Sequence, residues 1–312
     1  MAILWIGFLL LVALFLALDL GVFHRQQHVV GFREAMAWTA VWIACSLAFN
    51  VFIYVAYDNH WLGLGTLPFQ ATNGREAALS YLTAYVLEKS LSLDNIFVFA
   101  VIFGSFGVHP LYQHRVLFWG IIGAVVLRGI MITAGVAALQ HLEWLTYVFG
   151  MFLLFTGWKM LRHDMEEESH PEKSWVVRAA RRVLPMHNEY REGHFTVVFG
   201  GKRLFTPLAI VLIVVESSDV MFAVDSVPAV LAVTKDTFIA FTSNIFAILG
   251  LRAMYFALAG VLRKFRYLHQ SLAILLGYIG VKMLLQHHWH IPTALSLGVI
   301  ALILQLPEFH IH

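Results

Sequence analysis

The sequence is poor in charge and contains a single cysteine. Charged residues make up 13% of its 312 residues, against 60% hydrophobic residues and a mean hydropathy of +0.75. A soluble domain carries about 25% charged residues, so this composition excludes an ordinary soluble protein and indicates a polytopic membrane protein. Because Cys45 is alone, the sequence offers neither a disulfide framework nor a thiolate metal site.

Two further signals are missing. The net charge is +2 and there is no basic block, so the sequence gives no indication of nucleic-acid binding. Residues 1–18 have no basic start and no clear small-residue cleavage site. We therefore expect a retained membrane span at the N-terminus rather than a signal peptide.

Hydropathy predicts an all-α fold with about nine transmembrane helices, which together form a single membrane domain over residues 1–312. Each predicted span is about 20 residues long, as a hydrocarbon core of about 30 Å requires. The spans are 2–23, 35–57, 79–104, 115–138, 143–162, 205–233, 238–262, 268–286 and 291–306.

Lys and Arg are distributed unevenly among the connections. The connections after the first, third, fifth and seventh spans, together with the span ends that adjoin them, hold fifteen of them, whereas those after the second and sixth hold only Arg75 and Lys235. Because such residues accumulate on the cytoplasmic side, we expect the N-terminus outside and the C-terminus in the cytoplasm.

The connection 163–204 is then a cytoplasmic loop. Its segment 174–184 reads as a short basic amphipathic helix against the inner leaflet. The sequence around Gly200 and Gly201 predicts a β-hairpin. On the opposite side, His287, His288 and His290 are candidate metal ligands, although His beside interfacial aromatic residues is more often structural.

The chain contains an internal repeat. Asp94-Asn-Ile-Phe97 resembles Asp219-Val-Met-Phe222, and Gly157-Trp-Lys-Met-Leu161 resembles Gly280-Val-Lys-Met-Leu284, at offsets of 125 and 123 residues. Arg128 matches Arg252 at a similar offset. Each copy holds three spans, so 79–162 and 205–286 form two three-helix units of opposite orientation. Inverted repeats are typical of transporters, whose site lies near the midplane between the copies.

Six acids lie inside predicted spans, where a charged side chain costs roughly 3 kcal/mol at the bilayer centre. They are Asp19, Glu88, Asp94, Glu216, Asp219 and Asp225. Three bases in the middle of spans, Lys89, Arg128 and Arg252, are candidates to neutralise these charges. Ion pairs such as Asp94–Arg128 and Asp219–Arg252 would serve structure alone, but at most three acids are neutralised in this way. A remaining carboxylate must be protonated or bind a cation, which suits a cation or proton exchanger.

The spacing of the acids leaves two geometries open. Glu216 and Asp219 share a helix face, whereas Asp225 is six residues beyond Asp219 and lies off that face in an ideal helix. Either the acids serve two faces, or the helix breaks near Ser217 or near Pro228. Candidate neutral ligands are Asn95, Ser218 and Asn244. An all-oxygen donor set suits Mg²⁺, Ca²⁺ or Mn²⁺, and the residues alone do not rank these ions.

Four segments resemble the TerC family of bacterial inner-membrane proteins, and within it the Alx-type members. They are Ala17-Leu-Asp-Leu-Gly-Val22, Glu88-Lys-Ser-Leu-Ser-Leu-Asp-Asn95, VESSDVMFAVDSVPAVLAVT at 215–234 and TSNIFAILGLRAMYFALAG at 242–260. The likeness extends from about residue 5 to residue 306. It implies a multi-pass protein of the inner membrane that exports Mn²⁺, and it places Mn²⁺ ahead of Mg²⁺ and Ca²⁺.

We therefore predict a divalent metal transporter and no enzyme activity. Asp94 and Asp219 hold the ion, Glu216 and Asp225 complete its ligands, and Glu88 and Asp19 relay protons or gate the site. Its partners are the lipid bilayer, the metal ion and, if exchange is coupled, protons.

Three other functions stay open. One is a membrane assembly or metal-loading factor that recruits membrane or secretion-machinery proteins. Another is a tellurium-resistance-associated membrane protein without direct transport. A third is an intramembrane hydrolase with paired carboxylates, for which the sequence contains no fixed arrangement of acid, base and nucleophile.

Overall fold

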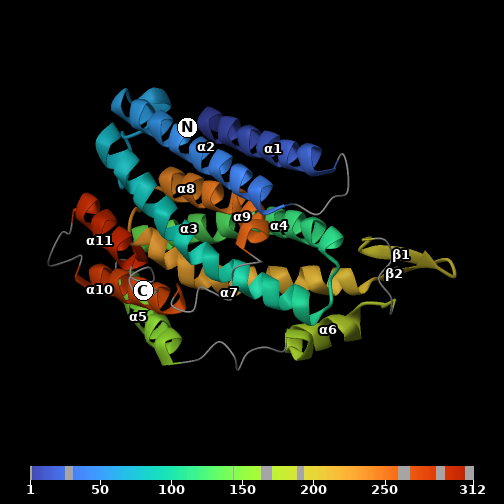
Figure 1. Cartoon of the computed structure of the whole chain (residues 1–312). Coiled ribbons are helices and arrows are strands. Elements are labelled where there is room, and N and C mark those ends of the chain that lie inside the picture. The colour runs from blue at the N-terminus through green and yellow to red at the C-terminus, as the bar shows by residue number, and fades with distance from the viewer. Residues whose placement is uncertain are drawn as a thin grey trace.

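Helices make up most of the protein (Figure 1). The computed structural model describes residues 2–24, 31–142, 144–162, 171–187, 193–258, 268–285 and 292–305. Its α-helices are α1 (Ala2–His24), α2 (Phe32–Asp58), α3 (Gly74–Ser105), α4 (Pro110–His141), α5 (Leu145–Arg162), α6 (Trp175–Val183), α7 (Pro207–Leu231), α8 (Thr237–Leu249), α9 (Leu251–Leu258), α10 (Leu268–Leu285) and α11 (Thr293–Gln305). A helix lies at each of the nine predicted span positions, and α8 and α9 share the seventh.

The helices identify a polytopic membrane protein. Within the described ranges, four helical stretches are long and apolar enough to cross a membrane, namely α2, α4, α7 and α8 with α9. Shorter apolar stretches lie in α1, α10 and α11. The 32-residue helix α3 carries Glu88, Lys89 and Asp94 near its middle, which lowers its hydropathy. The number of spans and the inverted repeat stay predictions.

Local sequence determines where the main helices begin. The Asn73 side chain caps α3 by accepting a hydrogen bond from the Glu76 amide at 2.9 Å, and the Glu76 carboxylate accepts one from the Thr72 amide at 3.0 Å. Pro110 occupies the first turn of α4, where its missing N–H costs nothing. Asp236 caps α8 through the amides of Phe238 and Ile239.

Helix α7 is continuous through all three of its carboxylates. The break considered near Ser217 or Pro228 is absent, and Pro228 lies inside the last turn of the helix. The acids therefore serve two faces of one helix, which is the other geometry predicted from the sequence. A break occurs instead at Gly250, where α8 ends and α9 begins.

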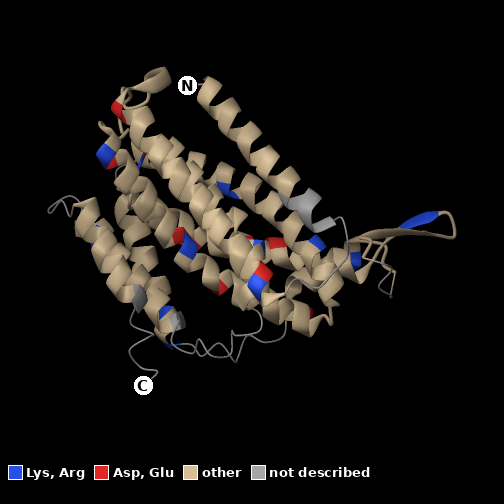
Figure 2. Cartoon of the chain, turned by 45° about the horizontal axis from the view of Figure 1, so that its top comes forward, with Lys and Arg blue, Asp and Glu red and all other residues tan. Residues whose placement is uncertain are grey.

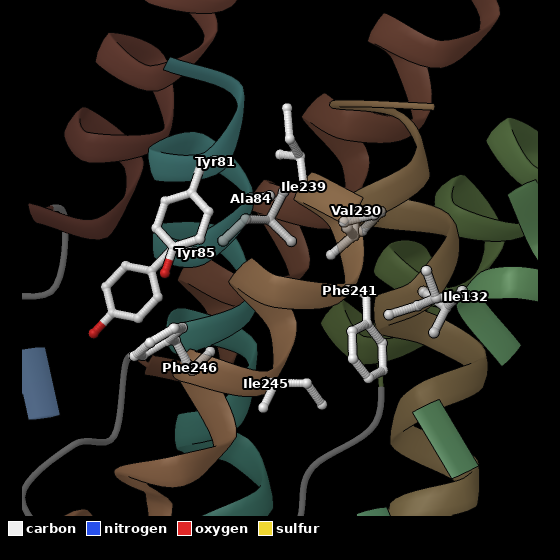
Figure 3. Packing of buried hydrophobic residues seen from close by; sticks show 14 of the residues in the cluster. Tyr81, Ala84, Tyr85, Ile132, Val230, Ile239, Phe241, Ile245 and Phe246 are labelled. Carbon is white, nitrogen blue, oxygen red and sulfur yellow. The ribbon is translucent and has the colours of Figure 1, made fainter. Parts of the chain in front are cut away.

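The central helix of the bundle is α8, and almost all of its residues are buried. It packs against α3 and α4, while α4 also packs against α7 and α5 packs against α10. Figure 3 shows part of the surrounding core, in which Tyr81, Tyr85 and Phe246 lie together. The rings of Tyr81 and Tyr85 stack at 6.4 Å, and Tyr81 meets Phe246 edge-on at 6.5 Å. This packing places α3, α4, α7 and α8 rigidly around the centre.

The connection between α5 and α7 contains a helix and a hairpin at the predicted positions. Strand β1 (Thr196–Phe199) pairs antiparallel with β2 (Lys202–Phe205) across Gly200 and Gly201. Both glycines have positive φ, at 56° and 76°, as a two-residue hairpin turn requires. The hairpin projects beyond the ends of the helices (Figure 1), whereas α6 packs against α7. A short 3₁₀ turn (Pro171–Lys173) precedes α6, and another (Trp61–Gly63) follows α2.

Candidate functional site

A buried arginine joins three helices at the centre of the bundle. Arg128 on α4 is paired through Nη1 with Oε1 of Glu88 on α3. Its Nη2 donates to Oδ1 of Asp219 on α7 at 3.0 Å. Nη1 also lies 3.4 Å from the Ser226 hydroxyl. Figure 2 shows such acidic and basic positions close together within the helices, far from both ends of the bundle.

This network brings together three predicted residues. Arg128, Glu88 and Asp219 are 0%, 1% and 5% exposed, respectively. Removing one partner of a buried ion pair costs about 3–5 kcal/mol, because the remaining charge has no compensation. The three side chains therefore depend on one another, and Arg128 is balanced against two carboxylates rather than one.

A cavity lies beside this network. Its volume is about 30 Å³, which is room for one or two water-sized occupants. Its lining combines acidic, amide and thioether side chains with apolar ones, namely Glu88, Leu91, Asp94, Asn95, Arg128, Met160, Phe222, Asp225, Ser226, Leu272 and Leu276. Three predicted carboxylates and one predicted neutral ligand thus share a single cavity.

The Glu88 carboxylate is only half satisfied. Its Oε1 is paired with Arg128, but its Oε2 is buried and has no hydrogen-bond partner among the described residues. An unpartnered carboxylate oxygen in a dry interior is costly, so such an atom calls for a proton or a cation. Glu88 lines the cavity, which supplies space for either.

Asp225 enters the cavity from α7 and is held from the opposite side by α5. The Thr156 hydroxyl donates to Oδ1 of Asp225 at 3.3 Å. The charges of Lys159 and Asp94 also act on this carboxylate, the first attractive and the second repulsive. Asp94 and Asp225 are thus near neighbours of equal charge, an arrangement that a divalent cation relieves.

Glu216 lies apart from the cavity, against a glycine of α4. A Cβ atom placed on Gly123 would be 2.1 Å from Oε1 of Glu216, so no larger residue fits there without moving the carboxylate. Glu216 also feels the charge of Asp219, one turn further along α7. A second cavity, of about 10 Å³, is lined by Asp219 together with Gly120, Val215 and apolar residues. The Arg128–Asp219 pair therefore lies between two cavities.

The other predicted residues are dispersed. Lys89 donates from Nζ to the carbonyl oxygen of Ala247 at 3.2 Å, at the C-terminal end of α8, where a positive charge is favourable. The Ser218 hydroxyl donates to the carbonyl oxygen of Val214 at 2.9 Å within its own helix. Asn244 is fully buried in α8, and neither of its amide atoms has a hydrogen-bond partner among the described residues. Arg252 is buried in α9.

Several predicted residues lie outside the described parts of the chain. Asp19 belongs to α1, but its side chain is not among those described, and neither are His287, His288 and His290. Within the described residues, no three His, Cys, Asp or Glu side chains are close enough together to hold a metal ion. The structure thus places Glu88, Asp94 and Asp225 around one cavity without assembling the predicted four-carboxylate cage.

Four residues at the site were not predicted from the sequence. Met160 reaches the cavity from α5, Thr156 on the same helix donates to Asp225, Ser226 approaches Arg128, and Gly123 makes room for Glu216. Their residue types are common in apolar helices and carry no signal of their own. The repeat gave one indirect signal, because Met160 belongs to a matched segment.

Comparisons with known proteins give a consistent family. The family model described as "Integral membrane protein TerC family" matches residues 73–310. An uncharacterized membrane protein of Myxococcus xanthus is 48% identical over 96% of this chain and 88% of its own length. A protein of Escherichia coli (strain K12) named "Putative membrane-bound redox modulator Alx" is 46% identical over 96% of this chain and 90% of its own. No solved structure matches the chain.

Proposed function

The chain belongs to the TerC family of integral membrane proteins, and from this premise we propose that it exports a divalent metal ion, foremost Mn²⁺. One observation carries the proposal. The unpartnered Oε2 of Glu88 belongs to a cavity that Asp94 and Asp225 also line. Carboxylates from α3 and α7 that line one small cavity favour a cation as its occupant, with water completing its ligands.

Incomplete ligation suits a transported ion better than a resident one. Conduction requires binding that is favourable enough for entry and weak enough for release, often over several sites in succession. Asp94, Asp225 and the free Glu88 oxygen offer charge, and Asn95 offers a neutral oxygen in the same cavity. The site holds cargo in passage, with water completing its coordination.

Arg128 is the element that separates the two cavities. It lines the larger one, while its partner Asp219 lines the smaller. The guanidinium is paired with both Glu88 and Asp219, and a cation that binds these carboxylates would compete with it and release it. We infer that ion passage is coupled to the breaking and re-forming of this pair, so that both cavities are not open together.

The packing supports an inverted repeat. In the predicted units, α3, α4 and α5 correspond to α7, α8 with α9, and α10. The contacts between the units are reciprocal. The first helix of each unit packs on the second helix of the other (α3 on α8, and α7 on α4), and the two third helices, α5 and α10, pack on each other. A two-fold relation requires such reciprocal contacts. The cavity lies among residues of both units, as expected of a transport site.

The metal and the orientation rest on sequence arguments. Carboxylate and amide oxygens suit Mn²⁺, Mg²⁺ and Ca²⁺, and the resemblance to Alx-type members favours Mn²⁺. The resemblance to the TerC family favours a bacterial inner-membrane protein, and the distribution of Lys and Arg favours an N-terminus outside and a C-terminus in the cytoplasm. Proton exchange is the expected coupling, because a carboxylate site releases protons when it takes up metal.

The test is Mn²⁺ flux into inverted vesicles or proteoliposomes. Asp94→Asn and Asp225→Asn should each abolish flux, whereas Asp58→Asn, at an exposed position at the end of α2, should leave it unchanged. Unchanged flux in both cavity variants would rule out this transport site. Absence of flux in the wild-type protein would rule out the function itself.

A partner-recruiting role is the second candidate, and the hairpin favours it. Val198 and Phe199 are 70% and 62% exposed, and Lys202 and Arg203 follow them on the projecting β2 strand. Trimming residues 198–203 leaves the buried contacts of α6 with α7 in place. Loss of co-purifying membrane proteins with flux intact would support an assembly role, whereas loss of neither would remove this candidate.

The name of the E. coli relative mentions redox modulation. A thiol–disulfide mechanism within one chain needs two sulfurs, and this sequence supplies Cys45 alone. We infer that any redox effect shared with that relative arises from the transported metal. Cys45→Ser should therefore leave Mn²⁺ flux at the wild-type level.

A further inference from the structure

One face of α5 is directed toward Asp225. Thr156, Lys159 and Met160 are spaced three and four residues apart, so they lie on the same side of the helix. Thr156 donates to Asp225, Lys159 acts on it through its charge, and Met160 lines the cavity that contains it. The thioether is therefore placed in the same small space as the carboxylates of Asp94 and Asp225.

A thioether ligand in this cavity would discriminate between cations that bind to oxygen ligands with similar preference. Mg²⁺ and Ca²⁺ are hard ions that take oxygen ligands and gain little from sulfur. First-row transition metals accept softer donors, and their affinity for a mixed site rises along the series from Mn²⁺. Because the sulfur is uncharged, it adds this preference without adding to the negative charge of the cavity.

Met283, the repeat equivalent of Met160, has a different environment. It is 1% exposed, belongs to the main apolar core and does not line the cavity, whereas Met160 both packs against the same core and lines the cavity. Methionine commonly fills irregular gaps in cores. A change at Met283 therefore controls for the packing role alone.

We propose that Met160 is the residue that determines metal specificity, with its Sδ serving as a ligand that favours transition-metal ions over Mg²⁺ and Ca²⁺. The assignment rests on the proposed function and deepens it. Mg²⁺ is far more abundant in cells than transition metals, so an exporter with oxygen ligands alone would be occupied by the wrong ion.

The test is a competition experiment with Met160→Leu and the control Met283→Leu. Both changes conserve volume, so folding should be retained. Mn²⁺ flux into proteoliposomes is measured with increasing Mg²⁺ or Ca²⁺. Met160→Leu should lower the ratio of Mn²⁺ to Mg²⁺ preference by about tenfold, the scale on which one contact changes discrimination. Met283→Leu should leave the ratio unchanged.

A second variant keeps the test decisive. Met160→Gln replaces the sulfur by an amide oxygen and should shift preference further toward Mg²⁺ and Ca²⁺. Metal-dependent thermal stabilisation in detergent gives the same ratio without transport. An unchanged ratio in both Met160 variants, or an equal fall of the ratio in Met283→Leu, would overturn the assignment of Met160. The proposed function would still stand if the wild-type protein transported Mn²⁺ and Asp225→Asn did not. Absence of wild-type flux and of metal stabilisation would overturn both.

Discussion

Two buried carboxylates in this protein have opposite surroundings. Asp236, at the start of α8, is 2% exposed and accepts hydrogen bonds from the Tyr57 hydroxyl at 2.6 Å and from the amides of Phe238 and Ile239 at 3.0 and 3.4 Å. Glu88, at the centre of α3, is equally buried, but one of its oxygens has no hydrogen-bond partner among the described residues. Both lie within the same bundle, so burial alone does not explain the difference.

The comparison separates structure from function. Both oxygens of Asp236 accept hydrogen bonds, so this carboxylate needs no further partner, and it serves as a helix cap and a link between α2 and α8. A carboxylate with a free oxygen beside a cavity is prepared for an occupant that comes and goes. Variants at the two places should therefore change different properties, and the following changes test this from the largest expected effect to the smallest.

Removing Arg128 should have the largest effect on stability. Arg128→Met leaves Glu88 and Asp219 buried without their common partner, which should cost about 3–5 kcal/mol in the free energy of unfolding. Thermal unfolding in detergent measures this, and Arg115→Met, on the same helix nearer its end, is the control. An Arg128→Met protein as stable as the wild type at neutral pH would contradict the ion-pair network.

Neutralising Asp225 should change metal binding and leave stability nearly intact. Its hydrogen-bond partner is the neutral hydroxyl of Thr156, so Asp225→Asn breaks no ion pair like that of Arg128. Loss of an outer partner alone costs metal sites about 10–100-fold in affinity, so loss of a ligand should cost at least as much. Metal-dependent thermal shifts measure the change, and wild-type binding should strengthen as pH rises, because protons compete for the same oxygens. A wild-type metal response in Asp225→Asn would exclude this residue from the site.

Changes at Asp236 should lower stability and leave metal binding intact. Asp236→Ala removes a helix cap worth about 1 kcal/mol, and Tyr57→Phe removes one hydrogen bond to a charged group worth about 1.5–3 kcal/mol. Both should lower the unfolding temperature without weakening metal binding. Burial raises the pKa of Asp236, although its donors oppose the shift. A raised folded-state pKa makes its stability contribution greatest at acidic pH and smaller as pH rises through that pKa, so Asp236→Ala should reduce this pH dependence. A fall in metal affinity would contradict the separation of roles.

Filling the space beside Glu216 should have the smallest effect. Gly123→Ala places a methyl group where the carboxylate lies, whereas at Gly120 the added Cβ would meet a Val215 methyl at 3.2 Å. We expect Gly123→Ala to lower Mn²⁺ flux by about tenfold, the cost of a modest displacement of a functional group, and Gly120→Ala to change it less. Equal effects of the two changes would show that packing, not Glu216, is responsible.

The sequence predicted where the helices and the hairpin lie along the chain, but indicated much less about which side chains of different helices contact one another. Long apolar runs made the helix positions predictable, and Gly200-Gly201 made the hairpin turn predictable. Because charged side chains are costly in a bilayer, the acids inside the predicted spans were identifiable as candidate site residues from the sequence alone. Each of these signals is local, because it depends on residues that are neighbours in the chain.

Partner choice between helices could not be predicted in the same way. Arg128 pairs with Glu88 and Asp219, a choice that depends on how α3, α4 and α7 rotate against one another. The continuity of α7 could not be predicted either, because a proline inside a membrane helix can break the helix or be accommodated within it. Thr156 and Met160 became visible only when α5 was placed against Asp225.

Counting bound Mn²⁺ tests the central claim most directly. Free aqueous Mn²⁺ gives a strong paramagnetic resonance signal that is lost on binding, so a titration of purified protein in detergent yields both stoichiometry and affinity. We predict saturable binding to the wild-type protein and to Asp236→Asn, and its loss in Glu88→Gln. Binding retained in Glu88→Gln, or lost in a folded Asp236→Asn, would contradict the assignment of Glu88 to the site and of Asp236 to the scaffold.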